Sequence, residues 1–176
     1  MTTIFITGFM GAGKTTIGQL LANQLQIPVV DTDVYIEQRE GSAISEIFGD
    51  KGEAYFREAE TAALQQLCTN EQKIVTTGGG IIMKEQNRQL MKKHGVVIFL
   101  EVDLAVIFDR LKGDTSRPLI QNQEQARIQE LYEKRLPLYR EAANLIIHTT
   151  DQTAEQVAGE VIQRLKLEEN GETNTV

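Results

Sequence analysis

Residues 3–16 read TIFITGFMGAGKTT, and this stretch decides the fold. Residues 8–15 match G-x-x-x-x-G-K-[ST], the pattern of a phosphate-binding loop or P-loop. The surroundings fit the pattern, because the β-branched run 3–7 predicts a strand and the apolar spacing within 17–25 predicts a helix. A glycine turn that matches by accident is the alternative, and the strand and helix on either side argue against it.

The P-loop predicts a nucleotide site that uses magnesium. Its glycines let successive backbone N–H groups point at phosphate oxygens, and the helix N-terminus adds partial positive charge. Lys14 is placed to reach the β- and γ-phosphates, and the Thr15 hydroxyl is placed to bind Mg²⁺. The predicted ATP-binding residues of the loop are Gly11, Ala12, Gly13, Lys14, Thr15 and Thr16.

The composition narrows the class of protein. A chain of 176 residues with 41% hydrophobic and 24% charged residues is typical of one globular domain. The net charge of −7 offers no general attraction for nucleic acid. No apolar run approaches the ~20 residues of a membrane span, and the single Cys68 predicts no internal disulfide. We therefore expect a cytoplasmic protein without nucleic-acid or membrane partners, and nothing in the sequence requires a dimer.

Strands and helices alternate along the chain. This pattern predicts an α/β fold of three layers, with five parallel strands and helices on both faces of the sheet. We expect one domain over 1–165 and a frayed tail over 166–176. The further predicted strands are 28–31, 73–77, 96–100 and 144–148, and the further predicted helices are 33–38, 43–48, 53–68, 84–93, 104–111, 123–141 with an interruption near Pro137, and 154–165.

Two carboxylates follow the second predicted strand. In an extended segment Asp31 and Asp33 point the same way, at the carboxyl edge of the sheet where parallel strands place their ligands. One carboxylate is suited to support Mg²⁺ through water, and the other is suited to accept a hydroxyl proton. A helix N-cap is the alternative for Asp33, and both roles are compatible.

Three consecutive glycines, Gly78, Gly79 and Gly80, follow the third predicted strand. Glycines at that edge allow another group to approach the backbone closely, although a plain flexible loop is also compatible with them. In many P-loop enzymes this strand ends in an acidic metal ligand, and its absence here makes Asp31 more important as the candidate.

Three arginines are candidates for binding anions. Arg57 has Glu53 and Glu60 at helical spacing, so a simple ion pair is the alternative for it. Arg117 lies in a polar segment before a proline, where helix is disfavoured, and is placed to close over phosphates. Arg135, taken alone, would be a surface residue.

Taken together, these motifs resemble the shikimate kinase family over residues 4–165. The resemblance implies a P-loop kinase fold similar to that of nucleoside monophosphate kinases, with a lid at about 112–122 and a helical substrate-binding segment at about 33–61. It also implies transfer of the γ-phosphoryl of ATP to the 3-hydroxyl of shikimate in aromatic amino-acid biosynthesis. The motifs are GFMGAGKTTIG at 8–18, DTD at 31–33, FRxxE at 56–60, GGG at 78–80, RPL at 117–119 and RLPLY at 135–139.

The resemblance also implies a role for each matched residue. Arg57 and Arg135 match arginines that bind the substrate carboxylate, and Asp33 matches the residue that accepts from the ring hydroxyls. Residues 78–80 match the loop that closes on the ring. Many members read RPLL at the lid where this chain reads RPLI, a conservative change. The implied catalytic residues are Lys14, Asp33 and Arg117, the implied further ATP contacts are Arg110, Arg117 and Gln152, and the implied metal contacts are Thr15 and, through water, Asp31.

Two other functions remain open at this point. If the chain were a gluconate kinase of the same fold, the two arginines and the glycine triplet would have a smaller role. A non-catalytic nucleotide-binding regulator would be suggested by loss of Lys14, Thr15 or Asp33, and all three are present.

Overall fold

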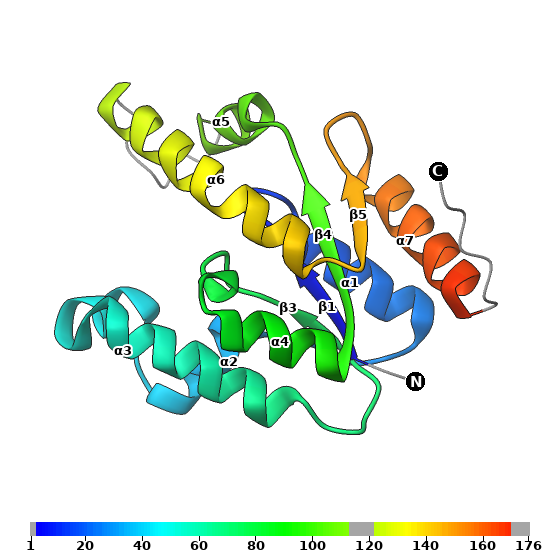
Figure 1. Cartoon of the computed structure of the whole chain (residues 1–176), viewed down its shortest axis with the longest axis horizontal. Coiled ribbons are helices and arrows are strands. Elements are labelled where there is room, and N and C mark those ends of the chain that lie inside the picture. The colour runs from blue at the N-terminus through cyan, green and yellow to red at the C-terminus, as the bar shows by residue number, and fades with distance from the viewer. Residues whose placement is uncertain (1–2, 113–121, 170–176) are drawn as a thin grey trace.

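The computed structural model describes residues 3–112 and 122–169, and it places five parallel strands in one sheet (Figure 1). The strand order is β2-β3-β1-β4-β5, so β1 with its P-loop lies at the centre. This arrangement confirms the predicted α/β fold. The strands are β1 (Thr3–Thr7), β2 (Val29–Asp31), β3 (Ile74–Thr76), β4 (Gly95–Glu101) and β5 (Leu145–His148).

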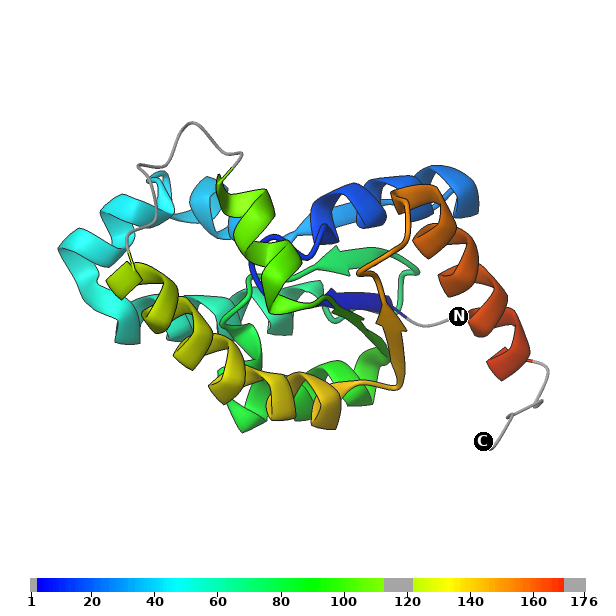
Figure 2. The ribbon, with the colours of Figure 1, turned by 90° about the horizontal axis from the view of Figure 1, so that it is seen from above.

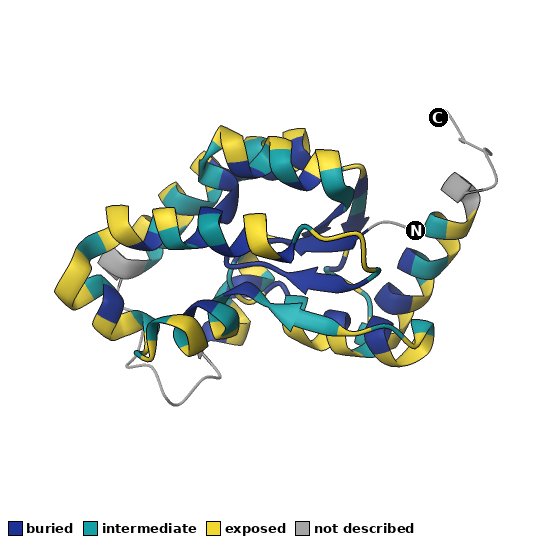
Figure 3. Cartoon of the chain, turned by 90° about the horizontal axis from the view of Figure 1, so that it is seen from below, coloured by how far each residue is buried: buried dark blue, intermediate teal, exposed yellow. Residues whose placement is uncertain are grey.

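The three inner strands are apolar because helices cover both of their faces. Ile4 of β1 pairs with Ile74 of β3 on one side and with Val96 of β4 on the other. Such continuous β-branched runs are typical of a buried parallel sheet. At the edge, β2 is only half-buried, and Figure 3 shows it paler than its neighbours.

Helices lie in two layers, one on each face of the sheet (Figure 2). On one face α1 packs against α7 and the central strands, and on the other face α4 and α6 pack against β4 while α3 packs against α4. A short 3-10 turn, η1 (Ile81–Met83), follows the glycine triplet. The helices are α1 (Lys14–Leu25), α2 (Thr32–Glu40), α3 (Ile44–Leu67), α4 (Glu85–His94), α5 (Leu104–Lys112), α6 (Asn122–Ala142) and α7 (Ala154–Glu169).

A second, smaller core lies apart from the main one. The main core fills the space between the sheet and its helices, whereas α2 and α3 share their own cluster of Ile36, Ile47, Phe56 and Ala63. The α2–α3 unit therefore has apolar contacts of its own beside the sheet.

The helices differ from the sequence prediction in several places. The two helices predicted at 43–48 and 53–68 are present, but the first runs on to meet the second at non-helical Gly52 of α3, where φ is 80° and ψ is 170°. No interruption occurs at Pro137, and α6 passes through it because buried Arg135 and Tyr139 anchor the adjacent turns. Helix α7 continues to Glu169, since Lys, Leu and Glu at 166–169 are good helix formers.

Within the parts of the chain that the structure describes, no helix has the length and apolar character needed to cross a membrane.

Candidate active site

The P-loop joins β1 to α1 with a backbone that only glycine adopts readily. Gly8, Gly11 and Gly13 have φ angles of 157°, 74° and 86°. Gly13 is the N-cap of α1, so the loop ends where the first N–H groups of the helix point outward. The predicted strand, glycine loop and helix are thus confirmed, and this geometry suits an anion.

Lys14 lies half-buried inside this loop. Its Nζ donates a hydrogen bond of 2.9 Å to the carbonyl oxygen of Phe9. Burial lowers the pKa of Lys14 to about 8, although the charges of Asp33 and Asp31 act in the opposite direction. Phosphate bound at the loop would favour the charged amine, because it adds negative charge next to it.

Six of the nine ATP-binding residues predicted from the sequence line one cavity of about 360 Å³, whereas Lys14 and Thr15 do not line it. On its far side, Arg110 reaches the P-loop and donates a 2.6 Å hydrogen bond from Nη1 to the carbonyl oxygen of Gly11. The cavity therefore joins the phosphate-binding loop to the loop after β5, as a nucleotide with its base would require. Arg117 lies outside the described residues. The predicted residues at this cavity are Gly11, Ala12, Gly13, Thr16, Arg110 and Gln152.

Asp31 is held by backbone and side-chain donors. It is the N-cap of α2, and its Oδ1 accepts from the backbone N–H groups of Asp33 and Val34 at 2.9 and 3.3 Å. Its Oδ2 accepts a 2.7 Å hydrogen bond from the Thr76 hydroxyl. The N-cap alternative for Asp33 is therefore wrong, because Asp31 comes directly before the first helical residue.

Asp31 and Thr15 line a second cavity of about 360 Å³ beside the P-loop. A carboxylate and a hydroxyl are hard oxygen donors of the kind that Mg²⁺ prefers. Among residues 3–112 and 122–169, no group of three or more His, Cys, Asp and Glu side chains is placed to hold a metal. Thr15 and, through water, Asp31 therefore fit a Mg²⁺ ion whose remaining positions water and phosphate oxygens would fill.

Asp33 has an unused oxygen that faces the glycine triplet. Its Oδ1 is buried and has no hydrogen-bond partner. A Cβ on Gly78 would lie only 2.5 Å from this oxygen, so a side chain at 78 would cover it. Burial and the charge of Asp31 raise the pKa of Asp33, and Lys14 opposes them.

The glycine triplet is packed closely by side chains from two helices. A Cβ on Gly80 would overlap the Arg57 guanidinium, and the carbonyl oxygen of Gly79 accepts a 3.2 Å hydrogen bond from Nη1 of Arg135. None of the three glycines has a positive φ. The prediction that other groups approach this backbone closely is therefore confirmed.

Arg57 combines an ion pair with a place in the site. Its Nη2 lies 2.8 Å from Glu53, and its Nη1 lies 2.8 Å from Oε2 of Glu60. Glu60 is fully buried, and its Oε1 has no hydrogen-bond partner. Burial raises the pKa of Glu60 to about 7, despite the opposing effect of Arg57.

Arg135 is buried, which excludes the surface position that it would have if taken alone. It is 8% exposed, its guanidinium lies 5.9 Å from the centre of the Phe9 ring, and its Nε has no hydrogen-bond partner. Burial lowers the pKa of Arg135, and the nearby charge of Arg57 adds to this effect. Two guanidinium groups thus lie close enough to repel each other beside the glycine triplet, an arrangement that favours an anion between them.

Tyr139 and Glu60 have structural roles at the site that the sequence did not predict. The Tyr139 hydroxyl lies 3.0 Å from the Gly8 carbonyl oxygen and 2.5 Å from that of Gly79, so it joins the P-loop to the glycine triplet. The available signal was helical spacing, because Tyr139 follows Arg135 by four residues and Glu60 follows Arg57 by three.

A family model described as shikimate kinase matches residues 10–166. The chain belongs to the shikimate kinase family. A shikimate kinase of Sulfurihydrogenibium sp. (strain YO3AOP1) is 42% identical over 166 residues, which cover 94% of this chain and 99% of that protein. A shikimate kinase of Bacillus cereus (strain G9842) is 43% identical over 167 residues, which cover 95% of this chain and all of that protein.

A solved structure has the same architecture. The shikimate kinase from Acinetobacter baumannii, solved in complex with shikimate, superposes with a TM-score of 0.87 and 35% identity, over 94% of this chain and 93% of that one. That enzyme therefore shares the fold of this chain over nearly its whole length.

Proposed function

We propose that this chain, an ATP-dependent kinase of the shikimate kinase family, transfers the γ-phosphoryl of ATP to the 3-hydroxyl of shikimate. The products are shikimate 3-phosphate and ADP, in the pathway to chorismate and the aromatic amino acids. One observation supports shikimate as the acceptor. Arg57 and Arg135 lie against the glycine triplet, and beside Gly78 of the same triplet Asp33 presents an unpartnered carboxylate oxygen.

The acceptor side of the site suits a small ring that carries a carboxylate and hydroxyls. Arginine binds a carboxylate with two parallel hydrogen bonds, and Arg57 and Arg135 are the candidates. The free Oδ1 of Asp33 is the candidate acceptor for the attacking hydroxyl, with Gly78, Gly79 and Gly80 against the ring. In this proposal Asp33 orients the hydroxyl and takes its proton as the phosphoryl is transferred.

The nucleotide side neutralises charge and holds the phosphates in line. Lys14 and the backbone N–H groups of Gly11, Ala12, Gly13, Thr15 and Thr16 are the candidates that hold the phosphates, with Arg110 and Gln152 toward the base. Mg²⁺ supplies further charge neutralisation on the β- and γ-phosphates, and Thr15 with Asp31, through water, would hold it. Because the transition state is loose, positioning and charge neutralisation supply most of the rate.

The proposal extends to parts of the chain that surround the site. Residues 33–61 are the proposed substrate-binding segment, and the lid proposed at about 112–122, with Arg117, lies largely outside the described residues. We further propose that the protein is monomeric and works in the cytoplasm. No basic surface field argues for a nucleic-acid partner, since the net charge is −7.

An ADP-release assay with shikimate, gluconate and nucleoside monophosphates as acceptors tests the proposal. We expect turnover with shikimate and ATP, and background rates with the other acceptors. Turnover on gluconate would favour the other small-molecule kinase, and ATP binding without turnover on any acceptor would favour a regulator.

The carboxylate is tested separately with Arg57→Ala. This change should raise the KM for shikimate, because it removes a contact present before and during the reaction. With an analogue whose carboxylate is reduced to an alcohol, the same change should raise the KM much less. The difference between its effects on the two substrates should be roughly 1.5–3 kcal/mol. Equal losses on acid and alcohol would leave Arg57 as an ion pair only.

A further inference from the structure

Helix α3 is kinked at Gly52, and the kink divides it into two halves. The first half is 44–51 and the second is 53–67, with Gly52 at φ 80° and ψ 170°. Both ion-pair partners of Arg57, Glu53 and Glu60, belong to the second half. The Arg57 guanidinium and both of its ion-pair partners therefore belong to the second half, and the bend at Gly52 sets the angle between this half and the first.

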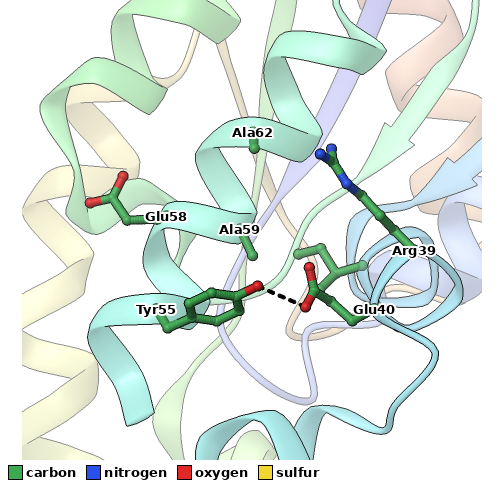
Figure 4. A pocket seen from close by; sticks show the side chains of 7 residues that line it. Arg39, Glu40, Tyr55, Glu58, Ala59 and Ala62 are labelled. Atoms are coloured by element: carbon green, nitrogen blue, oxygen red, sulfur yellow. Dashed lines mark hydrogen bonds between the residues drawn. The ribbon is translucent and has the colours of Figure 1, made fainter. Parts of the chain in front are cut away.

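The two ends of this second half are held differently. Leu64 and Leu67 anchor its far end in the main core. Near Arg57, the apolar contacts are those of the small core, with the Phe48 and Phe56 rings 4.7 Å apart across the kink. A cavity of about 190 Å³ separates α2 from α3 beside Tyr55, so the helices do not close on each other there (Figure 4).

One carboxylate oxygen crosses this gap and holds both sides of the kink. Oε2 of Glu40, at the end of α2, accepts a 2.8 Å hydrogen bond from Lys51 Nζ and a 2.8 Å hydrogen bond from the Tyr55 hydroxyl. Lys51 directly precedes Gly52, and Tyr55 lies three residues after it. Figure 4 shows the Tyr55 hydroxyl pointing across the cavity to Glu40.

Glu40 and Lys51 stabilise each other in their charged forms. Hydrogen bonds from Lys51 and Tyr55 lower the pKa of Glu40, and the same partners raise the pKa of Lys51. Both groups are therefore ionised at neutral pH. The Glu40 side chain is 16% exposed, while that of Lys51 is 46% exposed.

We propose that Glu40 is a positioning residue for the acceptor: it holds Lys51 and Tyr55 on the two sides of Gly52, sets the bend of α3, and so places Arg57 against the acceptor carboxylate. The inference rests on the proposed function, since it takes shikimate as the acceptor. Its effect is geometric, and an exposed ion pair of this kind adds little to overall stability.

The matched control lies in the same segment. Glu46 also uses one oxygen, Oε2, to accept two hydrogen bonds, from Ser42 Oγ at 2.7 Å and Ala43 N at 3.1 Å. Both of its partners precede the kink. Glu40→Ala and Glu46→Ala therefore each remove two hydrogen bonds to one carboxylate oxygen. Only the first variant removes the tie from α2 to both sides of the kink, where Lys51 and Tyr55 keep their own 3.3 Å hydrogen bond.

The experiment compares steady-state kinetics of the two variants, alone and combined with Arg57→Ala. We expect Glu40→Ala to raise the KM for shikimate about three- to fivefold, with kcat and the KM for ATP unchanged. Glu46→Ala should leave all three constants at the wild-type values. In the Arg57→Ala background, Glu40→Ala should change nothing further, because the two residues act in series. Tyr55→Phe removes one hydroxyl only, and it should raise the same KM by a smaller factor.

Failure of the proposed function and failure of this inference alone give different experimental results. Wild-type protein without turnover on shikimate overturns the proposed function and this inference with it. Wild-type turnover with equal KM values for Glu40→Ala and Glu46→Ala overturns the inference alone. An equal rise in KM with and without Arg57 also overturns it, since Glu40 would then act by another route. If Glu40→Ala does not fold, an unchanged KM in Tyr55→Phe overturns it.

Discussion

At the scale of the residue, three carboxylates at this site differ in what their oxygens already bind. Both oxygens of Asp31 accept hydrogen bonds from the protein, which suits a group that supports a metal through water. One oxygen of Asp33 and one of Glu60 have no partner, and both face the point beside Gly78 where a Cβ would lie. The hydrogen-bond partners of each carboxylate, and not its residue type, therefore distinguish one that supports a metal from one that is free to react.

This difference leads to a prediction for Asp33→Asn. The amide keeps the shape and an acceptor oxygen but cannot take the proton, so kcat should fall by on the order of 10². The Kd for ATP should change little, because the free oxygen of Asp33 faces the acceptor side. Initial rates and a nucleotide titration measure both quantities. ATP binding weakened as much as shikimate binding would instead make Asp33 a metal-site residue.

Glu60 predicts a pH dependence of stability. Its pKa is raised from 4.5 to about 7 in the folded protein, so the folded state binds more protons than the unfolded state between these values. The unfolding free energy should therefore fall as pH rises from 4.5 to 7, by up to about 3 kcal/mol from this group. Glu60→Gln should flatten this slope, as measured by urea midpoints across the range.

Glu53→Gln is the control for this slope. Glu53 also binds Arg57, but the Arg57 hydrogen bond lowers its pKa. A lowered pKa contributes stability above the unfolded pKa and loses it as pH falls. The unfolding free energy of Glu53→Gln should therefore fall between pH 4.5 and 7 as it does in the wild type. A flattened curve in this variant would show that the slope does not come from Glu60 alone.

At the scale of the element, α1 lies unusually close to β3. A Cβ on Gly18 would overlap Cγ2 of Thr76, whose hydroxyl holds Asp31. The close approach keeps the helix that begins at the P-loop next to the strand that ends at the glycine triplet. Glycine at 18 is thus required for packing between two elements that carry the site.

A pair of glycine-to-alanine changes tests this packing. Gly18→Ala should lower the unfolding free energy by about 1–3 kcal/mol, because the added methyl group overpacks the contact with Thr76. Gly159→Ala in α7 meets no atom within 4 Å, so it should raise stability by about 0.5–1 kcal/mol through helix propensity. Thermal or urea unfolding of both variants measures the difference. Stabilisation by both changes would show that α1 can move away from β3 without cost.

At the scale of the whole molecule, two cores of unequal size divide the chain. The sheet and its two helical layers share the main core, whereas the α2–α3 unit relies largely on the small cluster around Ile36 and Phe56. Local opening costs less where fewer apolar contacts are buried. The segment that carries Asp33 and Arg57 is therefore the part expected to open first.

Hydrogen exchange tests this division. Amides of 44–56 should exchange faster than those of β1 and β4 in the free protein. Shikimate at about ten times its Kd should slow exchange in 44–56 by on the order of tenfold, because it binds the closed segment only. Amides of α7, on the opposite face of the sheet, serve as the control and should not respond. Protection in 44–56 equal to that of β4 without ligand would contradict the two-core description.

Much of the fold followed from local pattern. Strand, glycine loop and helix at 3–25 are fixed by short-range chemistry, since a β-branched run, positive-φ glycines and helical spacing each act within a few residues. Five alternating strands then predicted a parallel sheet, and the structure confirms it. Pro137 was misleading for the same reason, because a local rule predicted a break that the buried neighbours Arg135 and Tyr139 prevent.

What the sequence by itself determined is therefore the P-loop, the α/β fold and, through the order of its motifs, the family. Only the tertiary structure decided which residues meet. Arg135 is buried beside the glycine triplet, Glu60 is a buried carboxylate with a free oxygen, and the Tyr139 hydroxyl joins two loops. The physical reason is that burial, pKa and hydrogen-bond partners depend on residues distant in sequence, whereas turns and periodicity depend on neighbours.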